Sequence, residues 1–159
     1  MFVPEKPGNK LYSSDYSQIE LRVLAHMADV KKLKEAFING EDIHTKTAKE
    51  VFKKDEITPL DRRHAKAVNF GIVYGISAFG LAQDLGISND EASEFIKKYY
   101  EAYPEIKTFM DKIIDSCKEN GYVSTMENRI RYVPEINSKI FMQREFAKRV
   151  AMNTPIQDL

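Results

Sequence analysis

The stretch RRHAKAVNFGIVYG, residues 62–75, carries two cations and then two aromatic rings on a four-residue period: Arg62, Lys66, Phe70 and Tyr74. In an α-helix each four-residue step turns about 40° beyond a full turn, so these side chains share an arc of about 120°. Ala65, Val68 and Ile72 fall on a different face of the same helix. We expect that second face to pack on the protein, which leaves the first face free for another role.

A face of this kind suits an elongated ligand with an anionic end and a flat end. Arg62 and Tyr74 lie about 18 Å apart along the axis, at about 1.5 Å per residue. Arginine and lysine donate charge-assisted hydrogen bonds to phosphate oxygens, and an aromatic face stacks on any base. Gly71 would leave room for close approach of the ligand. Spacing alone, however, favours an ordinary surface helix whose aromatic residues join the core.

Length and composition allow one domain or a piece of a larger one, since 159 residues with 43% hydrophobic content can form a core. Lysine plus arginine equals aspartate plus glutamate, at 24 each, so net charge indicates no partner. The charges are segregated: residues 84–105 hold six acidic and two basic side chains (2 − 6 = −4), and residues 129–149 hold the reverse (6 − 2 = +4). This permits an anionic ligand on one side, although most charge runs are only solvated faces.

Cys117 is the single cysteine, so the chain forms no internal disulfide and suits a reducing compartment. It follows the apolar pattern of its helix and is expected in the core. The first ten residues hold no apolar signal region, and no apolar run reaches membrane-spanning length. We therefore predict a cytoplasmic chain with no membrane partner.

The pattern of apolar residues predicts a mainly α fold with a small β component. Residues 9–18 are a short strand candidate, and residues 122–134 are predicted to form a hairpin that turns near 127–128. Capping signals place Thr58, followed by Pro59, and Ser88 at helix starts, and Ser17 with Glu20 has the spacing of a capping box. Helices are expected within residues 19–27, 31–40, 42–52, 58–75, 88–100, 104–121 and 138–153, the last one ending before Pro155.

A second segment, DYSQIELR at residues 15–22, places the carboxylate of Asp15 where the strand candidate gives way to a helix. Mg²⁺ favours one or two protein carboxylates together with substrate phosphates, and a strand end is well placed to supply one. Taken alone, Asp15 is equally compatible with a turn residue or a helix cap.

Together the two segments resemble motif A and motif B of the family A DNA polymerases, of the bacterial DNA polymerase I type. Motif A, D-Y-S-Q-I-E-L-R, stands complete at residues 15–22, and motif B, R-x-x-x-K-x-x-x-F-x-x-x-Y-G, is filled at residues 62–75. The resemblance extends to EDIHTKTA (41–48), GISAFGLAQ (75–83) and AMNTPIQ (151–157). It implies a fingers subdomain and part of the palm of a right-hand polymerase.

By this resemblance, residues 1–30 form a palm strand and helix with motif A. Residues 31–120 form the fingers with motif B, and residues 121–159 form a hairpin and helix that return to the palm. Asp15 would be a catalytic residue, one of two aspartates that position two Mg²⁺ ions. Lys66 would be catalytic too, and with Arg62 it would hold the triphosphate of the incoming nucleotide, assisted by His44.

The remaining nucleotide contacts that the resemblance implies involve the aromatic end of the helix. Phe70 would lie against the sugar and base, and Tyr74 would lie near the templating position. Glu20 would pair with Tyr74 and crowd the ribose 2′ position, and Gln18 would lie near the same pocket. Glu20 also fits a capping role, and the two are compatible. For His44, a phosphate contact and a half-buried helix histidine are equally open.

The resemblance assigns DNA binding to Tyr74, Gly75, Arg149, Asn153 and Gln157, the last three at the primer–template minor groove. That groove has a degenerate pattern, so contacts there would check shape over sequence. A solvated helix face is the alternative for Arg149 and Asn153. The partners implied are primer–template DNA and deoxynucleoside triphosphates.

One departure from the family is the absence of motif C, His-Asp-Glu on an apolar hairpin, which carries the second metal-binding aspartate. We therefore expect a partial chain that polymerises DNA weakly or not at all alone, with the remaining palm and thumb segments supplied by another chain. The implied reaction is attack of a primer 3′-hydroxyl on the α-phosphate by a two-metal mechanism. The alternatives are a non-catalytic nucleotide or primer–template binding module, and a helical interaction domain.

Overall fold

The computed structural model describes residues 3–4 and 6–158, so residues 1, 2 and 5 of the expected palm segment and residue 159 of the last segment lie outside it. In that part of the chain the elements are α1 (Ile19–Met27), α2 (Lys31–Ile38), α3 (Ile43–Phe52), α4 (Pro59–Val73), α5 (Ala78–Leu85), α6 (Asn89–Ala102), α7 (Pro104–Asn120), β1 (Tyr122–Ser124), β2 (Ile130–Tyr132), a short 3₁₀ helix (Pro134–Asn137) and α8 (Phe141–Gln157). The prediction of a mainly α fold with a small β component is confirmed.

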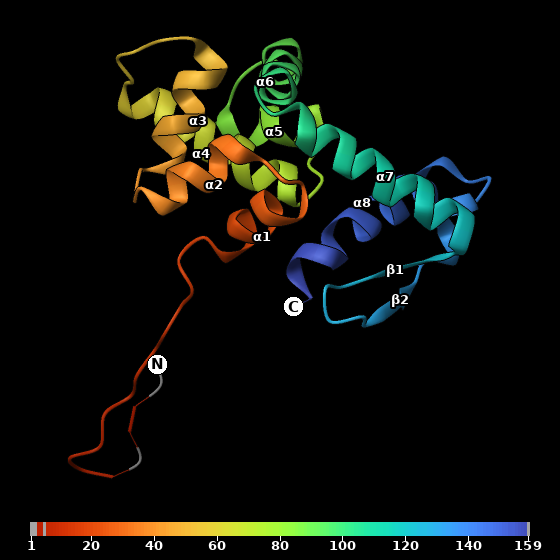
Figure 1. The fold of residues 1–159 in the computed structure, drawn as a ribbon, viewed down its shortest axis with the longest axis horizontal. Helices are drawn as coiled ribbons and strands as arrows, with labels where there is room; N and C mark the ends of the chain where they lie inside the picture. Colours follow the sequence, from red (N-terminus) through yellow and green to blue (C-terminus); the bar gives the residue numbers. More distant parts are fainter. Residues whose placement is uncertain (1–2, 5, 159) are drawn as a thin grey trace.

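The helices gather around two apolar clusters, which α7 connects (Figure 1). The larger cluster lies among α1–α7 and the end of α8 and includes the fully buried Leu24, Val73 and Tyr99. The smaller cluster lies under the hairpin, where Cys117 is fully buried as expected. No helix in the described ranges combines the length and the apolar character that crossing a membrane would need.

The predicted start signals of α4 and α6 are confirmed as capping boxes. The amide of Asp61 donates to the hydroxyl of Thr58 (3.1 Å), and the Thr58 amide donates back to the Asp61 carboxylate (3.1 Å). Ser88 and Glu91 repeat this arrangement at the start of α6. These reciprocal bonds satisfy amides that have no partner within the helix, and so they fix where each helix begins.

The predicted hairpin is also confirmed. β1 and β2 pair antiparallel, with Val123 opposite Arg131. The turn closes through a hydrogen bond from the Asn128 amide to the Thr125 carbonyl (3.0 Å), and Asn128 adopts a positive φ of 59°. Asparagine tolerates this left-handed conformation better than most residues, which explains the position of the turn.

Two predictions at the start of motif A are wrong. Residues 9–16 form no strand, since a strand needs a hydrogen-bonded neighbour and no described residue pairs with this segment. Figure 1 shows this segment running away from the helices. Ser17 and Glu20 form no capping box: Gln18 is the N-cap of α1, in a left-handed conformation (φ 55°) and without a side-chain cap.

The chain between residues 75 and 157 differs from prediction in two further places. α5 was not predicted; it starts at Ser77, whose hydroxyl accepts from the Gly80 amide (3.2 Å). The last helix does not end before Pro155 but continues to Gln157. Pro155 lacks the amide that would bond to the carbonyl four residues earlier, and it is tolerated one turn from the end, where it is buried.

Candidate functional site

The face of α4 predicted to bind a ligand points outward. Ala65, Val68 and Ile72 are buried on the opposite side, as expected. The cations Arg62 and Lys66 are exposed, as is Tyr74, while Phe70 is half-buried. We call these four residues the α4 stripe. Their order along the helix, charge first and aromatic rings last, is the one the sequence predicts.

Arg62 is held by a carboxylate at the start of α3. Its Nε and Nη2 donate to the two oxygens of Asp42 at 2.5 and 3.2 Å. These bonds hold the pKa of the Asp42 carboxyl well below its usual range and raise the pKa of Arg62. Asp42 is also the N-cap of α3, accepting from the His44 amide. The ion pair therefore joins the start of α3 to the start of α4. The third guanidinium nitrogen, Nη1, makes no hydrogen bond to a described residue.

Lys66 lies one turn further along α4 and is exposed. It forms no ion pair or hydrogen bond with any of the residues that the structure describes. A free ammonium group beside a fixed guanidinium concentrates positive charge at this end of the stripe. This end therefore suits an anionic group.

His44 is almost fully enclosed, at 3% exposed, yet it faces the stripe. Its ring lies 5.7 Å from the ring of Phe70, and its Nδ1 lies 3.1 Å from the amide nitrogen of Asn69. Burial lowers the pKa of His44; the charges of Arg62 and Lys66 lower it as well, against an opposing effect of Asp42. The imidazole is therefore neutral at neutral pH.

The aromatic end of the stripe borders a hollow of about 490 Å³ between α4, α5 and α8. Phe70, Gly71, Tyr74 and Gly75 line it, and α8 contributes Arg149. The structure thus brings together residues predicted to contact the nucleotide and residues predicted to contact DNA. A planar group entering this hollow would meet aromatic surface and a guanidinium.

α8 is packed tightly on the end of α4. Gly75 has a positive φ of 63°, and a Cβ there would lie 3.0 Å from the Cγ of Arg149. With its amide oriented to satisfy both neighbours, Asn153 donates to the carbonyl oxygens of Val73 (2.7 Å) and Arg149 (3.2 Å). Asn153 therefore joins the two helices, and its carbonyl oxygen is the end of the side chain left for another contact.

Glu20 of α1 acts on the hydroxyl of Tyr74 through its charge. Burial raises the pKa of Tyr74, and the negative charge of Glu20 raises it further. The pairing of these two side chains stays a prediction. Gln18 lies two residues before Glu20, at the left-handed turn that opens α1.

Gly71 has a contact within the protein that the sequence did not predict. A Cβ at this position would lie 2.5 Å from the Cγ2 of Ile76, closer than real Cβ contacts come. Gly71 also lines the hollow beside Phe70 and Tyr74, so its role in admitting a ligand stays a prediction. A glycine at position 71 is explained by the tight turn that folds Ile76 back onto α4.

Two predicted residues lie apart from this assembly. Asp15 is exposed in the extended segment before α1 and makes no hydrogen bond to a described residue. Within residues 3–4 and 6–158, no group of three or more His, Cys, Asp or Glu side chains could hold a metal. Gln157 is exposed at the end of α8, about 12 Å along the helix axis from Arg149.

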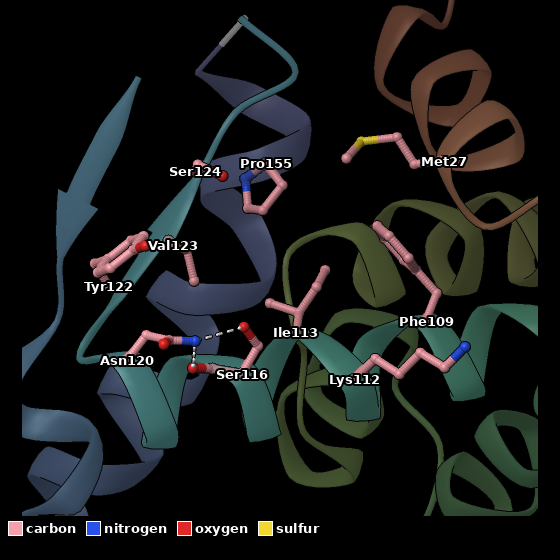
Figure 2. Close-up of a pocket in the computed structure, with 10 residues that line it drawn as sticks. All are labelled: Met27, Phe109, Lys112, Ile113, Ser116, Asn120, Tyr122, Val123, Ser124 and Pro155. Carbon is pink, nitrogen blue, oxygen red and sulfur yellow. Dashed lines mark hydrogen bonds between the residues drawn. The ribbon is translucent and has the colours of Figure 1, made fainter. Parts of the chain in front are cut away.

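A separate hollow of about 420 Å³ lies between α1, α7, β1 and α8 (Figure 2). Met27, Ile113 and Pro155 give it an apolar lining, while the Asn120 amide bonds to Ser116 (2.9 and 3.1 Å). None of the residues predicted from the sequence to bind or react lines it. The residues singled out by the two motifs lie elsewhere, four of them on the α4 stripe.

Three polar residues that support the stripe were not predicted: Asp42, Thr47 and Asn69. Asp42 precedes an apolar helix start, which is a capping signal. Asn69 lies beside Ala65, Val68 and Ile72 on the buried face of α4, and a polar residue in an apolar face is a sign of a buried network. Thr47, a single polar residue on a helix, gives no comparable signal.

Comparisons of the sequence and of the fold with known proteins point to one family. The sequence model described as DNA polymerase family A matches residues 1–158. DNA polymerase I of Bacillus caldotenax is 56% identical over 158 residues, and that of Bacillus subtilis is 54% identical; each match covers 98% of this chain and 18% of the relative. A solved structure, the POL domain of Pol1 from M. smegmatis in complex with DNA primer-template and dNTP, has a TM-score of 0.82 at 43% identity, over 90% of this chain and 26% of that one. The chain thus spans about a fifth of the length of these curated relatives.

Proposed function

This chain belongs to DNA polymerase family A, and from that premise we propose that it is the nucleotide-binding part of an enzyme that adds deoxynucleotides to the 3′-hydroxyl of a DNA primer. The observation that carries the proposal is the α4 stripe. It presents a fixed guanidinium, a free ammonium group and two aromatic rings, in that order, to one side of the molecule.

The stripe matches the chemistry of a nucleoside triphosphate. Arg62, through its free Nη1, and Lys66 would bind phosphate oxygens and offset the charge that develops on the leaving pyrophosphate. Phe70 would lie against the sugar and base. Tyr74, at the end of the helix, would lie against the templating base or the new pair. Glu20, in its predicted pairing with Tyr74, would narrow the space for a ribose 2′-hydroxyl.

The primer–template would lie along the end of α4 and α8. Tyr74, Gly75 and Arg149 border one hollow, and Asn153 is fixed between the two helices. Asn153 would use its free carbonyl oxygen, and Gln157 would contact the duplex two turns along α8. The positive balance of residues 129–149 supports a polyanionic partner.

Asp15 fits one ligand of a Mg²⁺ ion but not a whole site. Mg²⁺ is commonly held by one or two carboxylates together with substrate phosphates, and the described residues supply one such carboxylate near motif A. Bound there, Mg²⁺ would supply positive charge to the reacting phosphate oxygens. The other residues of this chain would bind and orient the nucleotide.

We assign residues 31–120 to the fingers, and residues 1–30 and 121–159 to parts of the palm. The apolar clusters cross these boundaries, since the larger one joins residues 21–30 to residues 33–110 and the smaller one joins Cys117 to residues 123–151. By themselves the 159 residues would bind nucleotides without polymerising DNA, since one carboxylate does not make a two-metal site.

A chimera tests the proposal. The matching stretch of DNA polymerase I from Bacillus subtilis, 54% identical, is replaced by this chain, and extension of a labelled primer is measured with Mg²⁺. We expect extension by the chimera and none by the 159-residue chain alone. Asp15→Asn and Lys66→Ala should each reduce extension at least about 100-fold. Lys97→Ala, at an exposed lysine of α6, is the matched control and should have no effect.

A folded chimera that extends no primer would contradict the proposal. Full activity of the Asp15→Asn chimera would contradict the role of Asp15 alone. Robust extension by the 159-residue chain would contradict the expectation that the remaining polymerase segments are required.

A further inference from the structure

A series of hydrogen-bonded buried polar side chains leads from the C-terminal end of α6 to the α4 stripe. The Tyr103 hydroxyl lies 3.4 Å from the Thr47 hydroxyl, and the Thr47 hydroxyl donates to the Asn69 carbonyl oxygen at 3.2 Å. The Asn69 amide nitrogen lies 3.1 Å from the Nδ1 of His44. All four side chains are at most 3% exposed. Buried polar groups are stable only when hydrogen-bonded, so each partner restricts the next.

The amide of Asn69 has a donor end and an acceptor end. Its carbonyl oxygen accepts from the Thr47 hydroxyl, and its nitrogen, which carries two N–H groups, donates one to the Thr47 oxygen (3.1 Å) and turns the other toward His44. Nδ1 of His44 must then accept, so it carries no proton. A neutral imidazole has one N–H, and that proton is left on Nε2.

Nε2 of His44 is not fully enclosed by the described residues. It makes no hydrogen bond to a described residue, and yet it is not among the fully buried polar atoms without a partner, of which the described chain has one, the Tyr99 hydroxyl. The ring also contacts Phe70 and lies in the field of Arg62 and Lys66, the cations of the stripe. An N–H group here would therefore face the anionic end of a bound ligand.

We propose that Asn69 is a positioning residue that fixes the Nε2–H tautomer of His44, so that His44 presents a neutral hydrogen-bond donor to a phosphate oxygen of the nucleotide. Thr47 and Tyr103 orient the amide of Asn69. The contact of His44 with a phosphate oxygen rests on the proposed function. The position of the proton on Nε2 rests on the buried network alone.

The tautomer is measured directly by NMR of the ¹⁵N-histidine-labelled 159-residue chain. The chain has three histidines, and the His44→Gln variant identifies the signals of His44. We expect a protonated Nε2 and an unprotonated Nδ1 in the unmodified chain. A proton on Nδ1 would overturn the inference. This measurement uses the unmodified chain, so it does not depend on whether a variant of Asn69 folds.

Asn69→Asp tests the positioning role, because a carboxylate accepts from Nδ1 and draws the proton to that side. We expect Nδ1 to become protonated and the affinity for inorganic tripolyphosphate with Mg²⁺ to fall about tenfold, the effect of losing one hydrogen bond to a charged group. In the His44→Gln background, where the glutamine amide supplies an N–H of its own, only the added negative charge acts on the ligand, so Asn69→Asp should lower the affinity by less. An equal loss in both backgrounds would show a merely structural role and overturn the proposal.

Failure of this inference differs from failure of the proposed function. Tight tripolyphosphate binding with a proton on Nδ1 overturns the tautomer and leaves nucleotide binding intact. A proton on Nε2, with no binding of tripolyphosphate or of a deoxynucleoside triphosphate by the unmodified chain, overturns the phosphate role together with the proposed function.

Discussion

Gly71→Ala separates two explanations of a glycine in motif B. The added Cβ would lie 2.5 Å from the Cγ2 of Ile76 and 3.3 Å from its Cβ. The nearer atom, Cγ2, moves only if the β-branched side chain of Ile76 leaves its χ1 rotamer, and the Cβ moves only with the turn at residues 74–77. If the glycine exists for this contact, the substitution destabilises the fold. If it exists for a ligand, the substitution spares stability and weakens binding.

Two opposing effects set the magnitude. Alanine in place of glycine within a helix contributes about 1 kcal/mol to stability. Overpacking a close-packed site commonly costs about 1–3 kcal/mol. The expected net change is a loss of about 1 kcal/mol in the free energy of unfolding, or about 2–4 °C in Tm for a chain of this length.

Urea denaturation followed by circular dichroism measures this change, and Ile76→Ala provides the matched background. Without Cγ2 the remaining approach is the 3.3 Å Cβ contact, which needs only a small shift. Gly71→Ala should then be neutral or stabilising, giving a coupling of about 1–2 kcal/mol between the two sites. Equal destabilisation in both backgrounds, or unchanged stability with weaker nucleotide binding, would refute the reasoning.

Three further predictions concern the elements around the stripe. Asp42→Asn should retain the cap of α3 but lose the ion pair with Arg62, lowering the free energy of unfolding by about 0.5–1 kcal/mol. Because the pair lowers the pKa of Asp42, this contribution is present above about pH 3.8 and is lost as the pH falls below it, so the two chains should converge in urea titrations at acid pH. Burial lowers the pKa of His44, so as the pH falls the unfolded chain binds a proton at this histidine before the folded chain does. The free energy of unfolding should therefore fall from pH 7 to pH 5.5. Thermal melts should show a smaller fall for His44→Gln. Thr58→Ala should cost about 1 kcal/mol by removing the capping box of α4, whereas an unchanged urea midpoint would show that the box contributes nothing.

Local signals in the sequence predicted much of this fold. Thr58 with Asp61 and Ser88 with Glu91 act within one helical turn, so their roles depend little on the rest of the chain. The stripe was predictable for the same reason, since helical periodicity alone separates its face from the buried one. The strand at residues 9–18 was not, because a strand depends on a partner elsewhere in the fold.

The supports of the stripe depend on contacts between distant residues. The ion pair of Asp42 with Arg62 spans 20 positions, and the bond from Asn69 to His44 spans 25. Local sequence suggested a cap at Asp42 and a buried polar group at Asn69, but not their partners. The contact of Gly71 was not predicted for the same reason, because the atom that an added Cβ would meet belongs to Ile76, beyond the end of the helix.

The central claim is that the α4 stripe binds a triphosphate, and calorimetric titration of a deoxynucleoside triphosphate with Mg²⁺ into the 159-residue chain tests it most directly. Lys66→Ala removes the free cation of the stripe, and Lys97→Ala removes an exposed lysine of α6 as the control. Circular dichroism establishes that all three chains are folded. We predict saturable binding by the unmodified chain and by Lys97→Ala, and an affinity at least about tenfold lower in Lys66→Ala. Equal affinity in Lys66→Ala, or no binding by the folded unmodified chain, would contradict the claim.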